Sequence, residues 1–185
     1  MNLPNKITIS RIFLAVVTVV VFLCPFKHAY LIAAIIFVIA ALTDFLDGYL
    51  ARKTNAITTM GKFLDPIADK ILVISATILL LEKAVLPSPY GAIAIIIIIS
   101  RELIIGSFRQ VAAAASVILA ADKLGKLKTV LQDVSIPFLL ISVKDNIYYN
   151  DSIYYIGLSI FGLSVLVAVI SAINYMVINR SVIKH

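Results

Sequence analysis

Residues 44–69 read DFLDGYLARKTNAITTMGKFLDPIAD, and this stretch decides how the neighbouring chain is arranged. Two acidic pairs, Asp44 with Asp47 and Asp65 with Asp69, stand at helical spacings between two strongly apolar segments. Charged side chains beside such segments are costly in a membrane and usually serve a function. The stretch therefore predicts two consecutive helices joined by a polar turn, with carboxylates near the turn.

The chain around this stretch is far more apolar than a soluble protein. Of its 185 residues, 62% are hydrophobic and 14% are charged, with a mean hydropathy of +1.06. Soluble domains contain about 45–50% apolar and about 25% charged residues. The composition excludes a water-soluble globule, a disordered chain and a collagen, and the single Cys24 excludes a disulfide scaffold. We expect one membrane-embedded domain over residues 1–185.

Six apolar segments predict six transmembrane helices and an all-α, polytopic integral membrane protein. The segments are 12–25, 29–43, 71–86, 91–121, 130–143 and 153–178. The second and third segments reach spanning length once the polar extensions 44–52 and 61–70 continue the helices. Residues 112–121 either continue the fourth helix or form a short interfacial helix. Most lysines and arginines fall on the side of the N-terminus, which predicts that both termini are cytoplasmic.

Helical geometry collects the acids and several small residues onto two stripes. The first stripe holds Asp44, Asp47, Gly48 and Ala51, and the second holds Gly61, Asp65, Ala68 and Asp69. Four carboxylates that converge at low dielectric cannot all stay ionised without nearby positive charge. Because the ligands are oxygens without sulfur, divalent magnesium, manganese or calcium is the expected partner.

The small residues on these stripes predict a diphosphate beside the metals. Gly48, Ala51 and Gly61 remove side-chain bulk next to the acids, and Arg52 can clamp a phosphate or ribose oxygen. Solvated acidic helix ends and small-residue packing stripes are the simpler alternative. Two acidic pairs with small residues in register and an arginine favour the metal–diphosphate site.

Basic residues in the second half indicate an anionic substrate. Arg101 and Glu102 interrupt the fourth apolar segment, and Arg109 stands seven residues after Glu102, which suggests that Glu102 orients it. Positive-inside bias explains Arg101 poorly, since a buried arginine needs a carboxylate or a water-filled cavity. We predict a phosphate site made by Arg109 and Lys126, with Arg101 and Arg11 next. Arg11 has the alternative role of anchoring the helix start to lipid headgroups.

The aspartate pattern resembles the signature of the CDP-alcohol phosphatidyltransferases. It reads Asp44-x-x-Asp47-Gly48-x-x-Ala51-Arg52-x8-Gly61-x-x-x-Asp65-x-x-x-Asp69. The resemblance implies a six-helix membrane enzyme, usually a homodimer, that uses two magnesium or manganese ions to displace CMP from a CDP-linked lipid with an alcohol. The implied metal ligands are Asp44, Asp47, Asp65 and Asp69. The implied CDP-binding residues are Asp44, Asp47, Gly48, Ala51, Arg52 and Gly61. Asp69 is also implied as the general base.

Residues 2–11, 100–102 and 125–129 resemble the bacterial branch of this family whose acceptor is glycerol 3-phosphate. That branch implies transfer of a phosphatidyl group from CDP-diacylglycerol to sn-glycerol 3-phosphate, giving phosphatidylglycerol phosphate and CMP. The implied setting is the bacterial cell membrane, with the active site facing the cytoplasm and no nucleic-acid partner.

Other functions remain open from the sequence. Inositol phosphate, serine or phosphatidylglycerol are rival acceptors for the same reaction class. A membrane prenyltransferase also holds a diphosphate on metals, but it needs an apolar or aromatic cavity. A divalent-cation transporter usually places its ligands at the midplane on broken helices with repeats.

Overall fold

The structure is a computed structural model that describes residues 3–54, 59–114 and 122–179. The side chains of residues 3–7, 44–54, 59–63, 65, 66 and 114 are outside that description. Every regular element in the described ranges is an α-helix, which confirms the all-α prediction. The helices are α1 (Leu3–Leu23), α2 (Ala29–Thr54), α3 (Thr59–Glu82), α4 (Tyr90–Ala114), α5 (Lys123–Ile141) and α6 (Asp151–Ile178).

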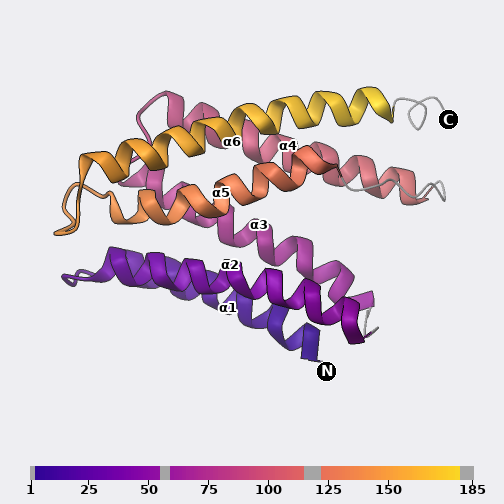
Figure 1. Ribbon diagram of the computed structural model, residues 1–185, viewed down its shortest axis with the longest axis horizontal. Coiled ribbons are helices and arrows are strands. Elements are labelled where there is room, and N and C mark those ends of the chain that lie inside the picture. The colour runs from indigo at the N-terminus through magenta and orange to yellow at the C-terminus, as the bar shows by residue number, and fades with distance from the viewer. Residues whose placement is uncertain (1–2, 55–58, 115–121, 180–185) are drawn as a thin grey trace.

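The six helices alternate in direction along the chain (Figure 1). The turns α1–α2, α3–α4 and α5–α6 lie at one end of the bundle, and the start of α1 and the end of α6 lie towards the other. The helices α1 and α2 pack as one pair and α5 and α6 as another, while α3 contacts α1, α4 and α5. The helices α2 and α5 also pack against each other, so the two pairs meet both directly and through α3, the helix that carries Asp69.

Two helices begin at least seven residues earlier than the apolar segments predict. The helix α1 begins at Leu3 rather than at residue 12, and α5 begins at Lys123 rather than at residue 130. At α5 the carboxylate of Asp122 accepts the backbone N–H groups of Leu124 (3.1 Å) and Gly125 (3.2 Å). This N-cap starts a helix whose first turns are polar, so an apolar run misses them. Both alternatives for residues 112–121 fall largely outside the described residues.

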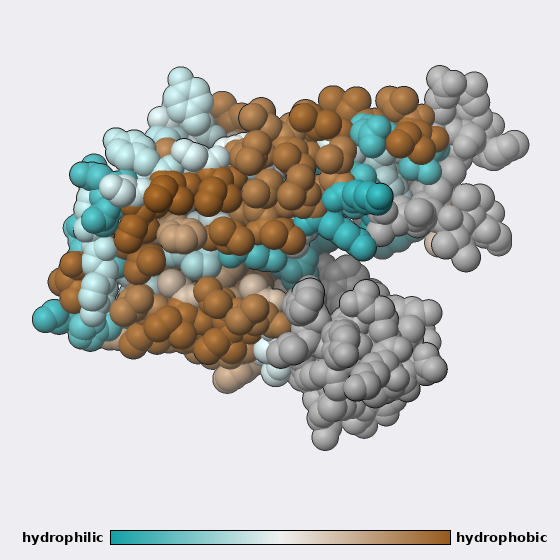
Figure 2. Space-filling view, viewed as in Figure 1, coloured by the Kyte–Doolittle hydropathy of each residue, from teal (hydrophilic) through white to brown (hydrophobic). Residues whose placement is uncertain are grey.

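The surface of the helices is apolar and part of their interior is polar. Large apolar side chains such as Phe13 (66% exposed) and Leu166 (63% exposed) face outwards, whereas Gln132 and Ser135 are fully buried. Figure 2 shows this as a broad hydrophobic band with hydrophilic residues gathered at one end and in a patch towards the other. Soluble monomers rarely expose apolar area on this scale. Such an apolar surface is consistent with a membrane protein.

Two helices within the described residues are long and apolar enough to cross a membrane. They are α4 over Tyr90–Ala113 and α6 over Asp151–Ile178. The segments Thr8–Leu23 and Ala29–Thr43 are shorter apolar helices by the same measure. The remaining four predicted spans stay predictions.

The apolar core occupies the end of the bundle that contains the three turns. Phe22, Leu80 and Leu140, each near the last turns of its helix, are at most 1% exposed and belong to one cluster with Phe37 and Phe161. Burial of each such side chain is worth about 1.5–3 kcal/mol against an aqueous reference. This packing leaves the opposite end of the bundle for polar groups.

Gly157→Ala tests the close packing of α6 against α5. A Cβ at Gly157 would lie 3.0 Å from Phe138 Cβ and 3.2 Å from two Leu139 side-chain atoms. Because Phe138 Cβ is fixed to the backbone, α6 must move away, and overpacking of this kind costs about 1–3 kcal/mol. We expect a melting temperature in detergent that is lower by several degrees. Gly162→Ala, with no atom within 4 Å of the new Cβ, is the matched control, and equal melting of both variants would contradict the packing.

Candidate functional site

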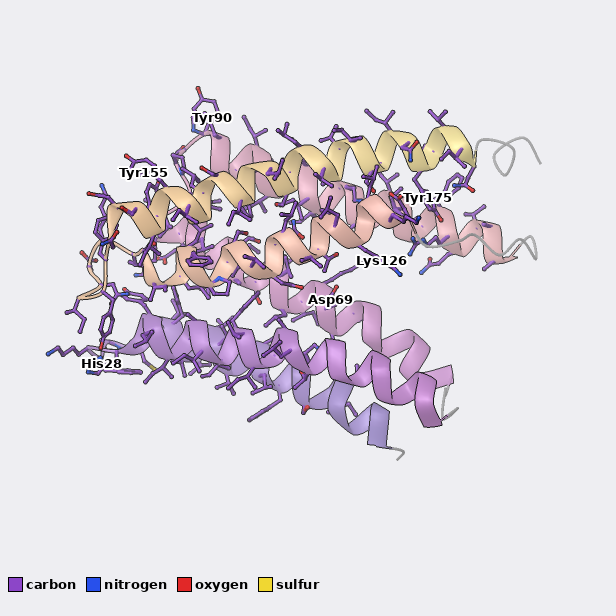
Figure 3. All side chains as sticks on the ribbon, in the orientation of Figure 1. His28, Asp69, Tyr90, Lys126, Tyr155 and Tyr175 are labelled. Atoms are coloured by element: carbon purple, nitrogen blue, oxygen red, sulfur yellow. The ribbon has the colours of Figure 1, made fainter. Side chains whose placement is uncertain are left out.

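A cavity of about 630 Å³ opens between α3, α4 and the start of α5. Its charged wall is formed by Asp69, Lys70, Arg101, Glu102, Arg109, Asp122 and Lys126. Figure 3 shows Lys126 and Tyr175 in the half of the bundle away from His28, Tyr90 and Tyr155, with Asp69 nearer the middle. The structure thus brings together Asp69 and three of the four residues predicted for the phosphate site.

One stripe of α4 faces this cavity. Glu102, Ile105, Gly106 and Arg109 stand at i, i+3, i+4 and i+7, and all four line the cavity. A Cβ at Gly106 would lie 3.4 Å from Lys70 Nζ. The glycine therefore leaves the space on this stripe that the lysine side chain from α3 approaches.

The carboxylate of Glu102 is shared by three cations from three helices. Its Oε1 lies 2.7 Å from Lys128 Nζ and 2.9 Å from Arg101 Nη1, and its Oε2 lies 3.8 Å from Lys70 Nζ. The side chains of Lys128 and Glu102 are only 6% and 15% exposed. This cluster ties α3, α4 and α5 together and surrounds one acid with three cations.

Arg101 is committed to protein partners. Its Nη1 binds Glu102, and its Nη2 donates to Ser171 Oγ on α6 at 2.7 Å. The hydroxyl of Ser171, in turn, donates to Asp122 Oδ2 at 2.6 Å. Burial raises the pKa of Asp122, but hydrogen bonds from Ser171 and from the backbone N–H groups of Leu124 and Gly125 outweigh it and hold that pKa below its usual value. Arg101 therefore lines the cavity with both Nη groups occupied.

Arg109 and Lys126 keep donors available for a ligand. Arg109 Nε donates to Tyr175 Oη at 3.1 Å, and the guanidinium carbon lies 5.2 Å from the centroid of the Tyr175 ring. Among the described residues, neither the Nη groups of Arg109 nor Lys126 Nζ forms a hydrogen bond or ion pair. The expectation that Glu102 orients Arg109 is wrong, because Glu102 pairs with Arg101, Lys70 and Lys128 instead.

Arg11 lies apart from this cavity. It is fully buried on α1 and is absent from the cavity wall. Its burial disagrees with the alternative that it contacts lipid headgroups at the surface.

The rest of the aspartate signature is described only through its backbone. Asp44, Asp47, Gly48, Ala51 and Arg52 belong to α2, and Gly61 and Asp65 belong to α3. Both segments are helical, so these residues have the helical spacing on which the two predicted stripes depend. Their side chains lie outside the described residues. Of the predicted metal ligands only Asp69 has a described side chain, and it lines the cavity. Convergence of the four carboxylates stays a prediction.

Lys70, Lys128, Ser171 and Tyr175 take part in the site without having been predicted for it. Ser171 and Tyr175 stand one turn apart on the buried face of α6, in the most apolar helix. In the sequence, the only indication of their role is a serine and a tyrosine at i, i+4 within a strongly apolar helix.

Gly125→Ala tests the contact between α5 and Arg101. A Cβ at Gly125 would lie 2.8 Å from Arg101 Nη2 and 3.7 Å from Ser171 Oγ. The guanidinium must shift and weaken its bond to Ser171, and a hydrogen bond to a charged group contributes about 1.5–3 kcal/mol. We expect a clearly lower melting temperature for Gly125→Ala and a smaller change for Gly106→Ala, whose new Cβ meets only the flexible end of Lys70. A larger loss in Gly106→Ala would contradict this order.

Comparisons with known proteins identify the family of this chain. The family model for CDP-alcohol phosphatidyltransferase matches residues 1–178. A protein of Bacillus subtilis (strain 168) named CDP-diacylglycerol–glycerol-3-phosphate 3-phosphatidyltransferase is 43% identical over 152 residues, covering 76% of this chain and 77% of the relative. Proteins of the same name from Rickettsia typhi (37% identical; 94% of each chain) and Salmonella choleraesuis (37% identical; 95% of this chain and 93% of the relative) are also similar. The chain belongs to the CDP-alcohol phosphatidyltransferase family, a family of transferases.

Proposed function

We infer that this chain transfers the phosphatidyl group of CDP-diacylglycerol to sn-glycerol 3-phosphate, giving phosphatidylglycerol phosphate and CMP. Curated relatives that are 35–43% identical to this chain over most of their length are named for this activity. The structural observation that carries the inference is the cavity wall, where Arg109 and Lys126 with available donors line the same cavity as Asp69. An anion site beside a carboxylate suits an acceptor that has both a phosphate and a hydroxyl group.

The charge of the cavity selects for a phosphate ester. Among the described residues that line the cavity, the cations outnumber the acids. The cations are Lys70, Arg101, Arg109 and Lys126, and the acids are Asp69, Glu102 and Asp122. Arginine matches phosphate with a fork of parallel N–H donors, and lysine adds a compact charge. Serine has no phosphate group and phosphatidylglycerol has only a singly charged phosphodiester, so neither requires as many cations as a phosphate monoester. A prenyltransferase is disfavoured because the described wall is charged rather than aromatic.

The donor set fits two magnesium or manganese ions. Asp69 contributes a carboxylate at the cavity, Asp65 precedes it by one turn on α3, and Asp44 and Asp47 stand on α2. Hard oxygen ligands without sulfur suit these cations. When bound, they would neutralise the diphosphate and the charge that develops on the CMP leaving group. We propose that Gly48, Ala51, Arg52 and Gly61 surround the CDP group beside them.

In the proposed reaction, the chain positions the acceptor and moves a proton. Arg109 and Lys126 hold the phosphate of glycerol 3-phosphate, so that its primary hydroxyl points towards Asp69. The carboxylate of Asp69 takes the hydroxyl proton while the oxygen attacks the phosphorus that bears diacylglycerol. A new phosphate ester bond forms, the diphosphate bond to CMP breaks, and CMP leaves.

We further propose that all six helices span a bacterial cell membrane, with both termini and the cavity on the cytoplasmic side. The start of α1, the end of α6 and the labelled residue Lys126 lie in the same half of the bundle, away from the three turns (Figures 1 and 3). A cytoplasmic opening admits the soluble acceptor and releases CMP, while the lipid tails stay in the bilayer. The family resemblance supports a homodimer as the working assembly.

Charge reversal at the phosphate site tests the acceptor. In Arg109→Glu and, separately, Lys126→Glu, repulsion of the acceptor phosphate is expected to raise the KM for glycerol 3-phosphate about 30-fold or more, since loss of a close charge pair costs 2–5 kcal/mol. The KM for CDP-diacylglycerol should change little. Lys144→Glu, an exposed lysine in the α5–α6 turn, is the matched control. Unchanged turnover in both variants would make glycerol 3-phosphate the wrong acceptor.

A further inference from the structure

Arg109 is held in place by a neutral residue of α6. Its Nε donates to Tyr175 Oη at 3.1 Å, and its guanidinium lies over the tyrosine ring with 5.2 Å between Cζ and the ring centroid. Tyr175 itself is 3% exposed and packs against Phe108 in a T-shaped pair, with a centroid distance of 6.0 Å and an interplanar angle of 79°. Two different contacts to one buried, packed ring restrict both the position and the tilt of the guanidinium.

The choice of partner keeps the arginine ready for an anion. A guanidinium has five N–H donors, and the bond to Tyr175 uses only the one on Nε. The Nη edge, which makes two parallel bonds to phosphate, remains available among the described residues. A carboxylate in the place of Tyr175 would neutralise the charge and compete with the ligand, whereas a phenol does neither.

Arg101 shows the opposite arrangement on the same helix. Its Nη1 binds Glu102 and its Nη2 binds Ser171, so its fork is already occupied by the protein. Ser171 and Tyr175 are one turn apart on the buried face of α6. One helix therefore supplies a hydroxyl to each arginine, but it leaves only Arg109 with a free Nη edge.

We propose that Tyr175 is a positioning residue for the acceptor site, which aligns the Nη edge of Arg109 with the phosphate and so favours phosphate esters over neutral alcohols. The proposal rests on the proposed function for the identity of the acceptor. Tyr175 touches no reacting atom in it and acts only through Arg109.

Tyr175→Phe is the most direct variant because it keeps the ring and removes only the hydroxyl. Without the bond to Nε the guanidinium rotates over the ring, and we expect the KM for glycerol 3-phosphate to rise about tenfold, as for loss of a charge-assisted hydrogen bond. The kcat and the KM for CDP-diacylglycerol should stay within about twofold of the parent values. The melting temperature should stay within about one or two degrees of that of the parent. Tyr155→Phe, an exposed tyrosine near the other end of α6, is the matched control.

A double variant separates action through Arg109 from a general structural effect. Once Arg109→Ala has removed the guanidinium, Tyr175→Phe should add no further rise in the KM for glycerol 3-phosphate. The proposal is overturned if the two changes multiply, if Tyr175→Phe leaves the acceptor KM unchanged, or if kcat, both KM values and the melting temperature fall or rise together.

Binding of inorganic phosphate keeps this test separate from that of the proposed function. If the parent protein releases no CMP with glycerol 3-phosphate, the proposed function fails, and titration of the metal-loaded protein with inorganic phosphate takes the place of kinetics. Phosphate binding about tenfold weaker in Tyr175→Phe than in Tyr155→Phe then supports the positioning role. Equal binding by the two variants, or no phosphate binding by the parent, contradicts it.

Discussion

Glu102→Gln is expected to destabilise the protein more than any other single change at the cavity. The amide keeps the size of the side chain but removes the charge that three cations share at 2.7, 2.9 and 3.8 Å. Lys128, with only 6% of its side chain exposed, then carries a nearly buried charge without its acid. Removing one member of a buried ion pair typically costs about 3–5 kcal/mol. The measurement is thermal or denaturant unfolding of the purified protein in detergent.

Glu82→Gln is the matched control for this prediction. Glu82 ends α3 and pairs with Lys83 at 3.6 Å, but its side chain is 56% exposed. Exposed pairs of this kind contribute about 0–1 kcal/mol. A loss at Glu102 no larger than the loss at Glu82 would show that the cluster does not hold α3, α4 and α5 together.

Asp69→Asn is expected to have the largest effect on turnover. Asparagine has the same size, but it neither accepts the hydroxyl proton nor binds a divalent cation as a carboxylate does. General base catalysis alone contributes about 10²–10⁴-fold, so CMP release should fall by at least about 100-fold. The measurement is the rate of CMP release at saturating substrates and metal.

Asp145→Asn controls for the loss of one negative charge. Asp145 is exposed in the α5–α6 turn, at the far end of the bundle, and its variant should work at the parental rate. A melting temperature close to that of the parent shows that Asp69→Asn is folded. Turnover by folded Asp69→Asn within tenfold of the parent would remove Asp69 from the role of base.

The sequence predicts the helices well wherever apolar residues run up to the helix end. The start of α6 differs from the apolar segment by only two residues, because Asp151 and Ser152 follow the capping Asn150 directly. At α5 the apolar run begins seven residues late, because the N-cap at Asp122 starts a turn that contains Lys123 and Lys126. The capping side chains set where these helices begin, and a hydropathy profile does not detect such caps.

The family could be predicted from the sequence, but the contacts between the cavity residues could not. The aspartate signature is a local pattern on two consecutive helices, so its spacing alone indicates the family. The partners of Glu102 are not local, since Lys70 and Lys128 come from α3 and α5. Helical spacing suggested that Glu102 orients Arg109, but in the packed bundle Arg109 donates a hydrogen bond to Tyr175 instead. Side-chain pairing between helices depends on how the helices cross, which periodicity does not specify.

CMP release by the purified protein in detergent tests the proposed transfer to glycerol 3-phosphate most directly. The assay contains CDP-diacylglycerol with magnesium or manganese, and it compares glycerol 3-phosphate, inositol phosphate, serine and phosphatidylglycerol as acceptors in parallel. We predict metal-dependent release of CMP with glycerol 3-phosphate alone. Release with another acceptor at an equal or higher rate, or no release from folded protein with any of them, would contradict the proposed function.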